Sequence, residues 1–334
     1  MSRYTEVVNS FAGKRVMVVG DVMVDSYLWG VVDRISPEAP VPVVDVNYRE
    51  ERLGGAANVA LNIKALGAEA LLCSVIGEEP KGDVLLNVLE KEGMSAEGII
   101  RSSGRITTTK FRIIGNNSQL LRVDEEITRD LDEADEKAYL ELCQGLLRDG
   151  GIDVMIMQDY NKGILTPNVI RSLITAANEN KIPVVVDPKK KNFELYRDVE
   201  LFKPNLKELK EGLKIHFSQP DEDVLRDTVN LLMQKMNARM AMITLSEHGV
   251  FIASRKGAKP AHHLVPAHQR NIADVSGAGD TVVSVAALCL ASDMPPEAIA
   301  TVSNLAGGIV CEKLGVVPID KPRLMIELAK LDEQ

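Results

Sequence analysis

The sequence predicts an α/β fold, in which a parallel-rich sheet carries helices on both faces and a small antiparallel β-sheet forms a lid. Short apolar runs recur along the chain and indicate strands that are buried on both faces. Helical stretches lie between these runs, and such strand–helix–strand alternation is typical of a parallel sheet. Two early segments instead alternate apolar and polar residues, which indicates antiparallel strands with one face in water.

The predicted strands of the main sheet occupy residues 15–20, 154–157, 184–186 and 241–245. Helices are predicted between them, for example over 167–180 and from Pro220 to residue 236. The longest apolar stretch, 282–291, is interrupted by Ser284 and is too short to span a bilayer. We therefore predict that it forms a buried helix.

The predicted lid comes from two insertions, at about 31–52 and 105–124, in a single domain that spans residues 1–334. In the first, Val44, Val46 and Tyr48 alternate with polar residues. In the second, residues 107–114 alternate likewise and are followed by a Gly-Asn-Asn turn at 115–117 and a further short strand. Alternation with this turn chemistry indicates hairpins.

Composition excludes some classes of function. The net charge is -9 and no basic stripe is visible, so the sequence predicts no nucleic-acid partner. Residues 1–14 lack the pattern of a signal peptide. Because no apolar run is long enough to span a bilayer, we expect no membrane partner. The cysteines are far apart and form no C-x-x-C pair, as expected of reduced thiols in a cytoplasmic protein. They are Cys73, Cys143, Cys289 and Cys311.

The strongest chemical signal is the segment 274–281, with the sequence DVSGAGDT, which is followed by the apolar helix. Gly277, Ala278 and Gly279 can bring backbone N–H groups close to an anion where the helix begins. Asp280 stands at the same point and can accept a proton from an attacking hydroxyl during phosphoryl transfer. The alternative is that Asp280 caps the helix and that the glycines form a tight turn.

A second signal is the segment 53–60, with the sequence LGGAANVA. Gly54 and Gly55 let the backbone approach a ligand, and Asn58 offers both a donor and an acceptor to sugar hydroxyls. The alternative is a glycine turn that precedes a well-packed helix.

Together, these two segments resemble the two signatures of the ribokinase (PfkB) family of carbohydrate kinases, and the resemblance extends from about residue 14 to residue 315. Within the family, it is greatest to kinases that phosphorylate D-glycero-D-manno-heptose 7-phosphate at the C1 hydroxyl, which gives heptose 1,7-bisphosphate for ADP-heptose and the lipopolysaccharide core. The segments that carry the heptose resemblance are 20–25, 34–43, 117–122, 159–163, 187–189 and 313–315.

The resemblance implies a ribokinase-like fold, ATP as co-substrate, Mg²⁺, and K⁺ as a candidate monovalent cation. It implies that Asp280 is the catalytic base and that the N–H groups of residues 277–279 form the anion hole. The residues that it places on the sugar hydroxyls are Asp25, Gly54, Gly55 and Asn58.

The resemblance also implies roles around the nucleotide. Asn205 and Glu208 match an element associated with Mg²⁺, although their spacing is equally that of a capping box. Asp187 is a candidate for contact with Mg²⁺ or phosphate, or else simply ends a strand. Asp274 and Ser276 fall where relatives bind a monovalent cation. Residues implied near the nucleotide are Thr244, Ser246 and Gly249 in a loop, and Asn304 and Gly308 beside the adenine.

A sugar phosphate requires a basic residue for its distal phosphate, and the bidentate fork of Arg suits that task. The favoured candidates are Arg122 on the lid and Lys162, with Asp159 of the same motif also expected at the substrate. A solvated surface position is the alternative for each basic residue. The remaining candidates are Arg112, Lys189 and Lys190.

Other readings remain open from the sequence. One is a kinase of the same fold that acts on an unphosphorylated sugar or a nucleoside, and another is a sugar- or nucleotide-binding regulator without catalysis. The resemblance further implies a homodimer through the lid strands. Because the sequence ends at Gln334, we expect a separate adenylyltransferase to act downstream.

Overall fold

The computed structural model describes residues 3–217, 221–255 and 261–331 of the chain. Its main sheet consists of β1 (Arg15–Gly20), β4 (Glu69–Gly77), β5 (Gly98–Ser102), β8 (Val154–Gln158), β9 (Val184–Asp187), β10 (Leu201–Phe202), β11 (Met240–Thr244), β12 (Val250–Ser254) and β13 (Ala261–Val265). The strand order is β13-β12-β11-β10-β9-β8-β1-β4-β5. In this order, neighbouring strands pair in parallel from β11 through β1 to β5. Strands β12 and β13 extend the β11 edge in antiparallel fashion.

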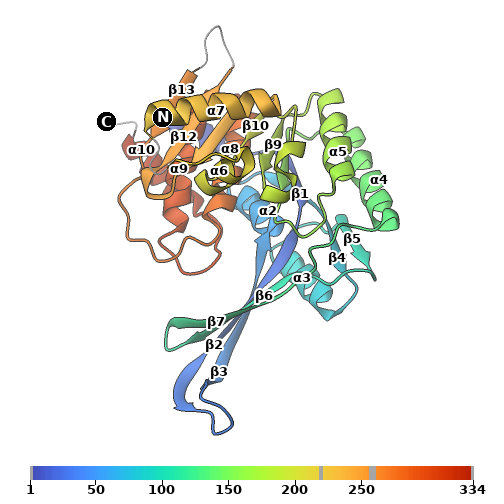
Figure 1. The fold of residues 1–334 in the computed structure, drawn as a ribbon, viewed down its shortest axis with the longest axis vertical. Coiled ribbons are helices and arrows are strands. Elements are labelled where there is room, and N and C mark those ends of the chain that lie inside the picture. The colour runs from blue at the N-terminus through green and yellow to red at the C-terminus, as the bar shows by residue number, and fades with distance from the viewer. Residues whose placement is uncertain (1–2, 218–220, 256–260, 332–334) are drawn as a thin grey trace.

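Helices cover both faces of this sheet (Figure 1). One face carries α1 (Arg3–Asn9), α2 (Ala56–Ala65), α3 (Pro80–Lys91), α8 (Ala278–Ala291), α9 (Pro296–Val310) and α10 (Lys321–Leu331). The other carries α4 (Glu133–Asp149), α5 (Pro167–Glu179), α6 (Leu206–Leu213), α7 (Glu222–Met236) and the 3-10 helix η1 (Lys190–Leu195). A further 3-10 turn, η2 (Ser246–His248), follows β11.

Strand β1 shows why these runs form central strands. Val16 and Val18 enter the hydrophobic core on one face of the sheet, whereas Met17 and Val19 enter the core on the other. Successive side chains of a strand point to opposite faces, so a strand that is covered twice needs apolar residues at every position.

The second sheet contains β2 (Val22–Ile35), β3 (Pro42–Gly55), β6 (Thr109–Gly115) and β7 (Ser118–Glu125), in the order β3-β2-β6-β7. Each hairpin is antiparallel, and the two hairpins join through a parallel pairing of β2 with β6. Asn116 and Asn117 adopt positive φ angles of 51° and 62°, which suits the tight turn between β6 and β7. Figure 1 shows this sheet extending from the body as an arm.

The predicted fold class and the predicted strands and helices are confirmed. Two details differ from the expectation. Strand β2 starts directly after β1, and its residues 22–27 are buried, so no alternation reveals them as the beginning of a lid strand. The predicted helix start at Pro220 lies outside the described residues, and α7 begins at Glu222, with Asp221 as N-cap. Among the helices of the described ranges, none combines the length and apolar character that crossing a bilayer requires.

Candidate active site

A pocket of about 700 Å³ opens at the carboxyl-terminal ends of β8, β9 and β11, the edge at which parallel α/β sheets bind ligands. Helices α8 and α9 wall its other side. The pocket therefore gathers residues from segments that are far apart in the sequence. Its lining includes Asp187, Asn205, Glu208, Thr244, Ser246, Gly249, Ala278, Gly279, Asp280, Asn304 and Gly308.

The start of α8 has the geometry of an anion-binding element. Gly277 is the N-cap residue, with a φ of 81°, and a Cβ atom added to it would lie 3.1 Å from Asn58 Nδ2. The first N–H groups of a helix have no partner within the helix, and the helix dipole favours an anion there. The N–H of Ala278 donates to Val275 O at 3.3 Å, a long bond that an anionic ligand can replace. This helix start can therefore hold a phosphoryl group.

Asp280 lies in the first turn of α8 and is only 3% exposed. Its Oδ2 accepts a hydrogen bond from Asn58 Nδ2 at 2.8 Å, and its Oδ1 accepts one from the Tyr160 hydroxyl at 2.7 Å. Burial raises the pKa of Asp280 from 3.8 to about 6, against the lowering effect of these two hydrogen bonds. A carboxylate with this pKa is largely ionised at neutral pH and is a competent general base.

Two charged groups from neighbouring strands lie beside Asp280. Asp187, at the end of β9, raises the pKa of Asp280, and Lys203 after β10 lowers it. Lys203 pairs with Asp187 at 3.1 Å, and Gln158 Nε2 donates to both Asp187 and Asp280. A Cβ atom on Gly279 would lie 3.9 Å from Asp187 Oδ2, which places this second carboxylate next to the helix start.

Asp25 lies on β2 and is 2% exposed. Its carboxylate is paired with the guanidinium of Arg112 on β6, which also lies 5.2 Å above the ring of Tyr27. Burial raises the pKa of Asp25, and the neighbouring Arg112 opposes that rise. Gly54 faces Asp25 on the adjacent strand, where any Cβ atom would collide with the carboxylate. Gly55 has a φ of 59° and likewise has no room for a side chain, because Asp21 O lies against it.

Asn205 and Glu208 form a complete capping box at the start of α6. The Asn205 side chain accepts from the Glu208 N–H at 2.8 Å, and Glu208 Oε2 accepts from the Asn205 N–H at 2.9 Å. Glu208 also pairs with Lys189. Both residues line the pocket as well, so the capping role is compatible with the predicted place beside a nucleotide.

Asp274 and Ser276 contact each other before α8. Asp274 Oδ1 accepts from both the N–H and the hydroxyl of Ser276 at 2.9 Å, and Oδ2 accepts from the Gly315 N–H at 2.9 Å. Burial by itself raises the pKa of Asp274, but these hydrogen bonds outweigh it and the net pKa is lowered. The carboxylate therefore stays ionised, as a monovalent cation site requires.

Asn304 and Gly308, which the resemblance predicts beside the adenine, lie one turn apart on α9 and line the pocket. Asn304 Nδ2 donates to Pro266 O at 2.8 Å and so ties α9 to the loop after β13. A Cβ atom on Gly308 would lie 2.8 Å from Arg270 Nε. Thr244, Ser246 and Gly249 form the opposite wall, at the turn from β11 to β12.

None of the predicted substrate residues is among those that line this pocket, and three of them have other partners. Asp159 is fully buried, and it accepts hydrogen bonds from Tyr196 at 2.7 Å and from the Asn161 N–H at 2.6 Å. Lys162 pairs with Glu126 at 2.8 Å. Arg122 is half exposed and pairs with Asp124 within its own strand. The structure thus gives Asp159 a role in holding its loop.

Sequence reasoning missed Tyr160, Gln158 and Lys203, which surround the carboxylates of the pocket. Tyr160 lies inside the segment 159–163 that carried part of the heptose resemblance, but its neighbours Asp159 and Lys162 were preferred. Gln158 and Lys203 stand at strand ends and carry no local motif. Only the strand order of the sheet reveals that they meet.

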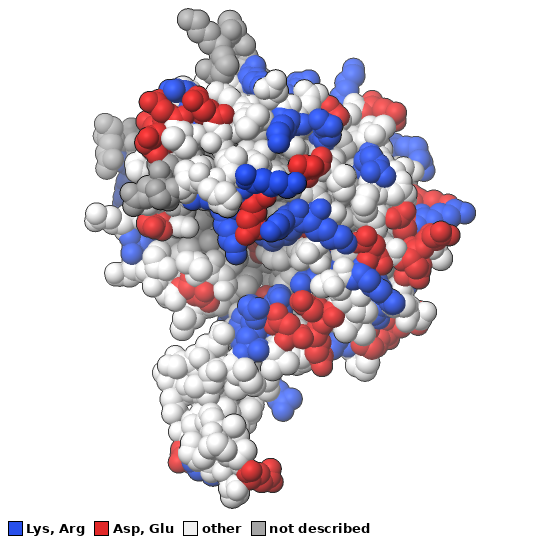
Figure 2. Space-filling view, in the orientation of Figure 1, with Lys and Arg blue, Asp and Glu red and all other residues white. Residues whose placement is uncertain are grey.

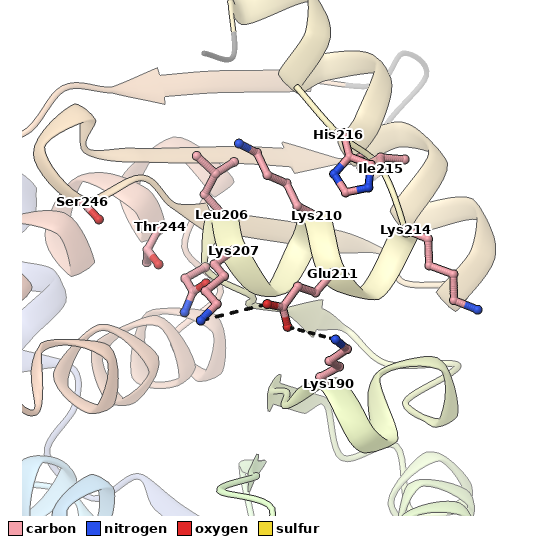
Figure 3. A pocket seen from close by; sticks show the side chains of 11 residues that line it. Lys190, Leu206, Lys207, Lys210, Glu211, Lys214, Ile215, His216, Thr244 and Ser246 are labelled. Atoms are coloured by element: carbon pink, nitrogen blue, oxygen red, sulfur yellow. Dashed lines mark ion pairs between the residues drawn. The ribbon is translucent and has the colours of Figure 1, made fainter. Parts of the chain in front are cut away.

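Basic residues line a second pocket, of about 900 Å³, that shares Asn205, Thr244 and Ser246 with the first. Figure 3 shows its lining around α6, with Lys190 and Lys207 paired to Glu211. In Figure 2, Lys and Arg side chains lie along this part of the body, whereas much of the visible face of the arm is uncharged. The other basic lining residues are Lys210, Lys214 and His216.

An anion-binding helix start, a buried carboxylate and a pocket at the end of a parallel sheet together define a small-molecule phosphotransferase. A family model described as pfkB family carbohydrate kinase matches residues 14–322. The chain therefore belongs to the pfkB family of carbohydrate kinases.

The chain is similar to "Bifunctional protein HldE" of Caulobacter sp. (strain K31), with 42% identity over 306 residues, which are 92% of this chain and 61% of that protein. The protein of the same name from Wolinella succinogenes is 39% identical over 309 residues, 92% of this chain and 63% of the relative. The chain thus spans about three fifths of the length of the curated relatives that it matches.

Solved structures share the fold. Phosphofructokinase-2 from Escherichia coli, in complex with substrates and products, superposes with a TM-score of 0.77 at 19% identity, over 95% of this chain and 99% of that one. Arabidopsis thaliana ribokinase, complexed with ribose and ATP, gives a TM-score of 0.71 at 16% identity, over 96% of this chain and 99% of that one. The ribokinase-like fold expected from the sequence is confirmed.

Proposed function

We propose that this protein uses ATP to phosphorylate D-glycero-D-manno-heptose 7-phosphate at the C1 hydroxyl, which gives heptose 1,7-bisphosphate for the synthesis of ADP-heptose. The observation that carries the proposal is the placement of Asp280. Its carboxylate stands between the anion-binding start of α8, in the nucleotide pocket, and Asn58, on the side predicted for the sugar.

In the proposed mechanism, Asp280 accepts the proton of the C1 hydroxyl as the oxygen attacks the γ-phosphorus of ATP. The N–H groups at Gly277, Ala278 and Gly279 hold the charge that develops on the transferred phosphoryl group. Asn58 keeps the carboxylate directed at the hydroxyl through its hydrogen bond to Oδ2. ADP leaves through the pocket that α9 borders.

Mg²⁺ fits this site in a form that keeps most of its waters. Within residues 3–217, 221–255 and 261–331, no group of three or more His, Cys, Asp or Glu side chains is arranged to hold a metal. Mg²⁺ usually binds through one or two carboxylates, waters and the phosphates of the substrate. We assign Asp187 and Glu208 to its water shell, and Asp274 and Ser276 to a monovalent cation such as K⁺.

The surroundings of Asp25 favour a phosphorylated sugar over a plain one. Arg112 pairs with Asp25, and Arg122 lies directly opposite Arg112 on the neighbouring strand, so both face the same side of the lid. Lys110, on the same face, lies opposite Asp124. This basic cluster stands beside the expected sugar site and suits the distal phosphate, with Arg112 closer to that site than the favoured candidates Arg122 and Lys162.

The choice of heptose is supported by the resemblance of the segments at 20–25, 34–43 and 159–163, and by the relatives named HldE, which match over about 90% of this chain. We further propose that the enzyme works in the cytoplasm, where ATP and reduced thiols occur, and that an adenylyltransferase acts on the product downstream.

The test is ADP release by the purified protein with ATP and Mg²⁺. Heptose 7-phosphate is compared with ribose, fructose, fructose 6-phosphate and a blank without sugar. Turnover with heptose 7-phosphate alone, with phosphate found on C1 by ³¹P NMR, is the expected result. Turnover with another sugar would overturn the heptose assignment and leave the kinase assignment standing. Absence of turnover with every sugar, despite measured ATP binding, would favour the binding regulator.

We also propose that the lid forms a homodimer interface. Large apolar side chains are exposed at neighbouring same-face positions of the arm, such as Leu121 with Val123 and Val46 with Tyr48. Contiguous exposed apolar surface marks protein interfaces. Sedimentation equilibrium should give a dimer, and Leu121→Asp with Val123→Asp on β7 should yield monomers. A wild-type monomer at micromolar concentration would contradict the proposal. The exposed apolar residues of the arm are Val31, Ile35, Val41, Val46, Tyr48, Leu120, Leu121 and Val123.

A further inference from the structure

Tyr160 is the one aromatic hydroxyl in the described residues that contacts the proposed base. The loop that follows β8 carries it to the pocket, where its hydroxyl donates to Asp280 Oδ1 at 2.7 Å. Asn58 donates to the other oxygen, Oδ2, at 2.8 Å. Both oxygens of the carboxylate therefore accept hydrogen bonds from two different segments of the chain, and these bonds fix its plane. Gln158 Nε2 donates a longer third bond to Oδ1 at 3.3 Å.

The loop that carries Tyr160 is itself held by a buried carboxylate. Asp21 Oδ2 accepts from the N–H groups of Tyr160 at 2.8 Å and Lys162 at 3.1 Å, and its Oδ1 accepts from the Ile164 N–H at 3.1 Å. Asn161 between them adopts a φ of 58°. Three hydrogen bonds to one side chain fix the backbone of this loop. The Tyr160 hydroxyl is therefore held in one position, beside Asp280.

The surroundings of Tyr160 and Asp280 keep the proton on the Tyr160 hydroxyl, so this hydroxyl is the donor of their hydrogen bond. Burial, and then the nearby Asp280, raise the pKa of Tyr160 well above its usual value, so the phenol keeps its proton. Its hydrogen bond lowers the pKa of Asp280, which burial raises to about 6. Lys189 lies 5.5 Å above the Tyr160 ring. The other charged groups that act on the pair are Asp187, Lys203 and Asp25.

We propose that Tyr160 is a positioning residue of the kinase, whose hydroxyl orients the Asp280 carboxylate by donating to Oδ1. This inference rests on the proposed function, because it takes Asp280 as the base. Tyr160 acts through Asp280 and needs no contact with the sugar.

The experiment is the pH dependence of kcat and kcat/KM for wild type and Tyr160→Phe between pH 5 and 9. Because a hydrogen bond to the ionised form favours that form, its removal should move the acid limb upward by about one pH unit, from near 6 to near 7. At pH 9 the variant should recover kcat to within about tenfold of wild type, because the base is then ionised in both.

Tyr139→Phe is the matched control. Tyr139 is a buried tyrosine whose hydroxyl donates to Cys73 O at 2.8 Å, in the core on the opposite face of the sheet from α8. Its loss should lower the melting temperature without moving the acid limb. A second variant works in the opposite direction, since 3,5-difluorotyrosine at position 160 is a stronger donor and should move the limb downward.

An acid limb at the same pH in wild type and Tyr160→Phe, or an unchanged limb with difluorotyrosine, would overturn the inference. So would a loss of kcat that is equally large at pH 6 and pH 9, because a merely structural role predicts that result. Failure of the proposed function is distinguished by Asp280→Asn, since full activity of that variant would remove Asp280 as the base whatever Tyr160 does.

Discussion

Asp21 and Asp280 are two buried carboxylates with the same altered acidity and different surroundings. Asp21 is 1% exposed and Asp280 is 3% exposed, and burial raises the pKa of each from 3.8 to about 6. Asp21 accepts three backbone N–H groups and borders a cavity of about 10 Å³, the size of one water. Asp280 accepts from side chains and lines a pocket of about 700 Å³.

The difference teaches that a raised pKa does not by itself identify a general base. Perturbed carboxylates mark active sites only as a statistical tendency, because structural networks perturb them as well. Access to a ligand decides between the two aspartates. The Asp280 carboxylate lies beside a pocket and the N-terminus of a helix, whereas the Asp21 carboxylate is surrounded by the backbone of one loop.

The largest expected effect is that of Asp280→Asn on turnover. General acid–base catalysis contributes roughly 100- to 10,000-fold, so kcat should fall by that factor while the Kd for ATP, measured by calorimetry, stays within about threefold. Retention of more than a tenth of wild-type kcat would contradict the assignment of the base.

The same variant should keep or gain stability, which serves as its control. The folded-state pKa of Asp280 lies above its unfolded value, so the protonated side chain favours the folded state. This contribution to the free energy of unfolding is complete below about pH 4 and is lost as the pH rises through about 6. The change from 3.8 to about 6 corresponds to about 3 kcal/mol against the ionised form. Asp280→Asn should therefore melt at or above the wild-type temperature at pH 7.5, and this advantage should vanish near pH 4.

A smaller effect on turnover and a lower stability than that of Asp280→Asn are expected from Asp21→Asn, because both changes remove a carboxylate of raised pKa but only this one takes an acceptor from a loop backbone. An amide cannot accept from all three N–H groups of the loop, because its nitrogen faces at least one of them as a second donor. An unsatisfied buried donor costs about 1–3 kcal/mol, which offsets the gain from removing a carboxylate of raised pKa. Thermal denaturation at pH 7.5 should therefore show a melting temperature several degrees below that of Asp280→Asn.

Turnover of Asp21→Asn should fall by about tenfold or less, since the loop affects Asp280 only through Tyr160. The two Asp→Asn variants thus separate the two aspartates with one chemical change. If Asp21→Asn lost as much kcat as Asp280→Asn at unchanged stability, Asp21 would have to take part in the chemistry, and the comparison would fail.

Much of the architecture was predictable because it depends on local patterns. Doubly covered strands such as β1 need an unbroken apolar run, and the turn at Asn116 and Asn117 needs residues that tolerate positive φ angles. The start of β2 was not predictable in this way. Its first residues are buried inside the body, so the alternation that reveals a lid strand is missing there.

The site was predictable where one segment holds several of its parts. Gly277, Ala278, Gly279 and Asp280 are consecutive, and an anion hole at a helix start is a local property of the backbone. Asn205 and Glu208 were found through the family resemblance, and their spacing gave the alternative that they cap α6. The roles of Asp159 and Lys162 could not be judged from their motif, because their partners Tyr196 and Glu126 come from elsewhere in the chain.

The sequence by itself determined the fold class, the family resemblance and the identity of the candidate base, because each depends on residues that are close together in the chain. Only the tertiary structure decided that Asn58 and Tyr160 donate hydrogen bonds to Asp280. Asn58 is 222 residues from Asp280 in the sequence, and Tyr160 is 120 residues from it. It also decided that Arg112 pairs with Asp25. The physical reason is that burial and hydrogen bonds between distant segments arise from the crossing of strands and helices, which no local pattern encodes.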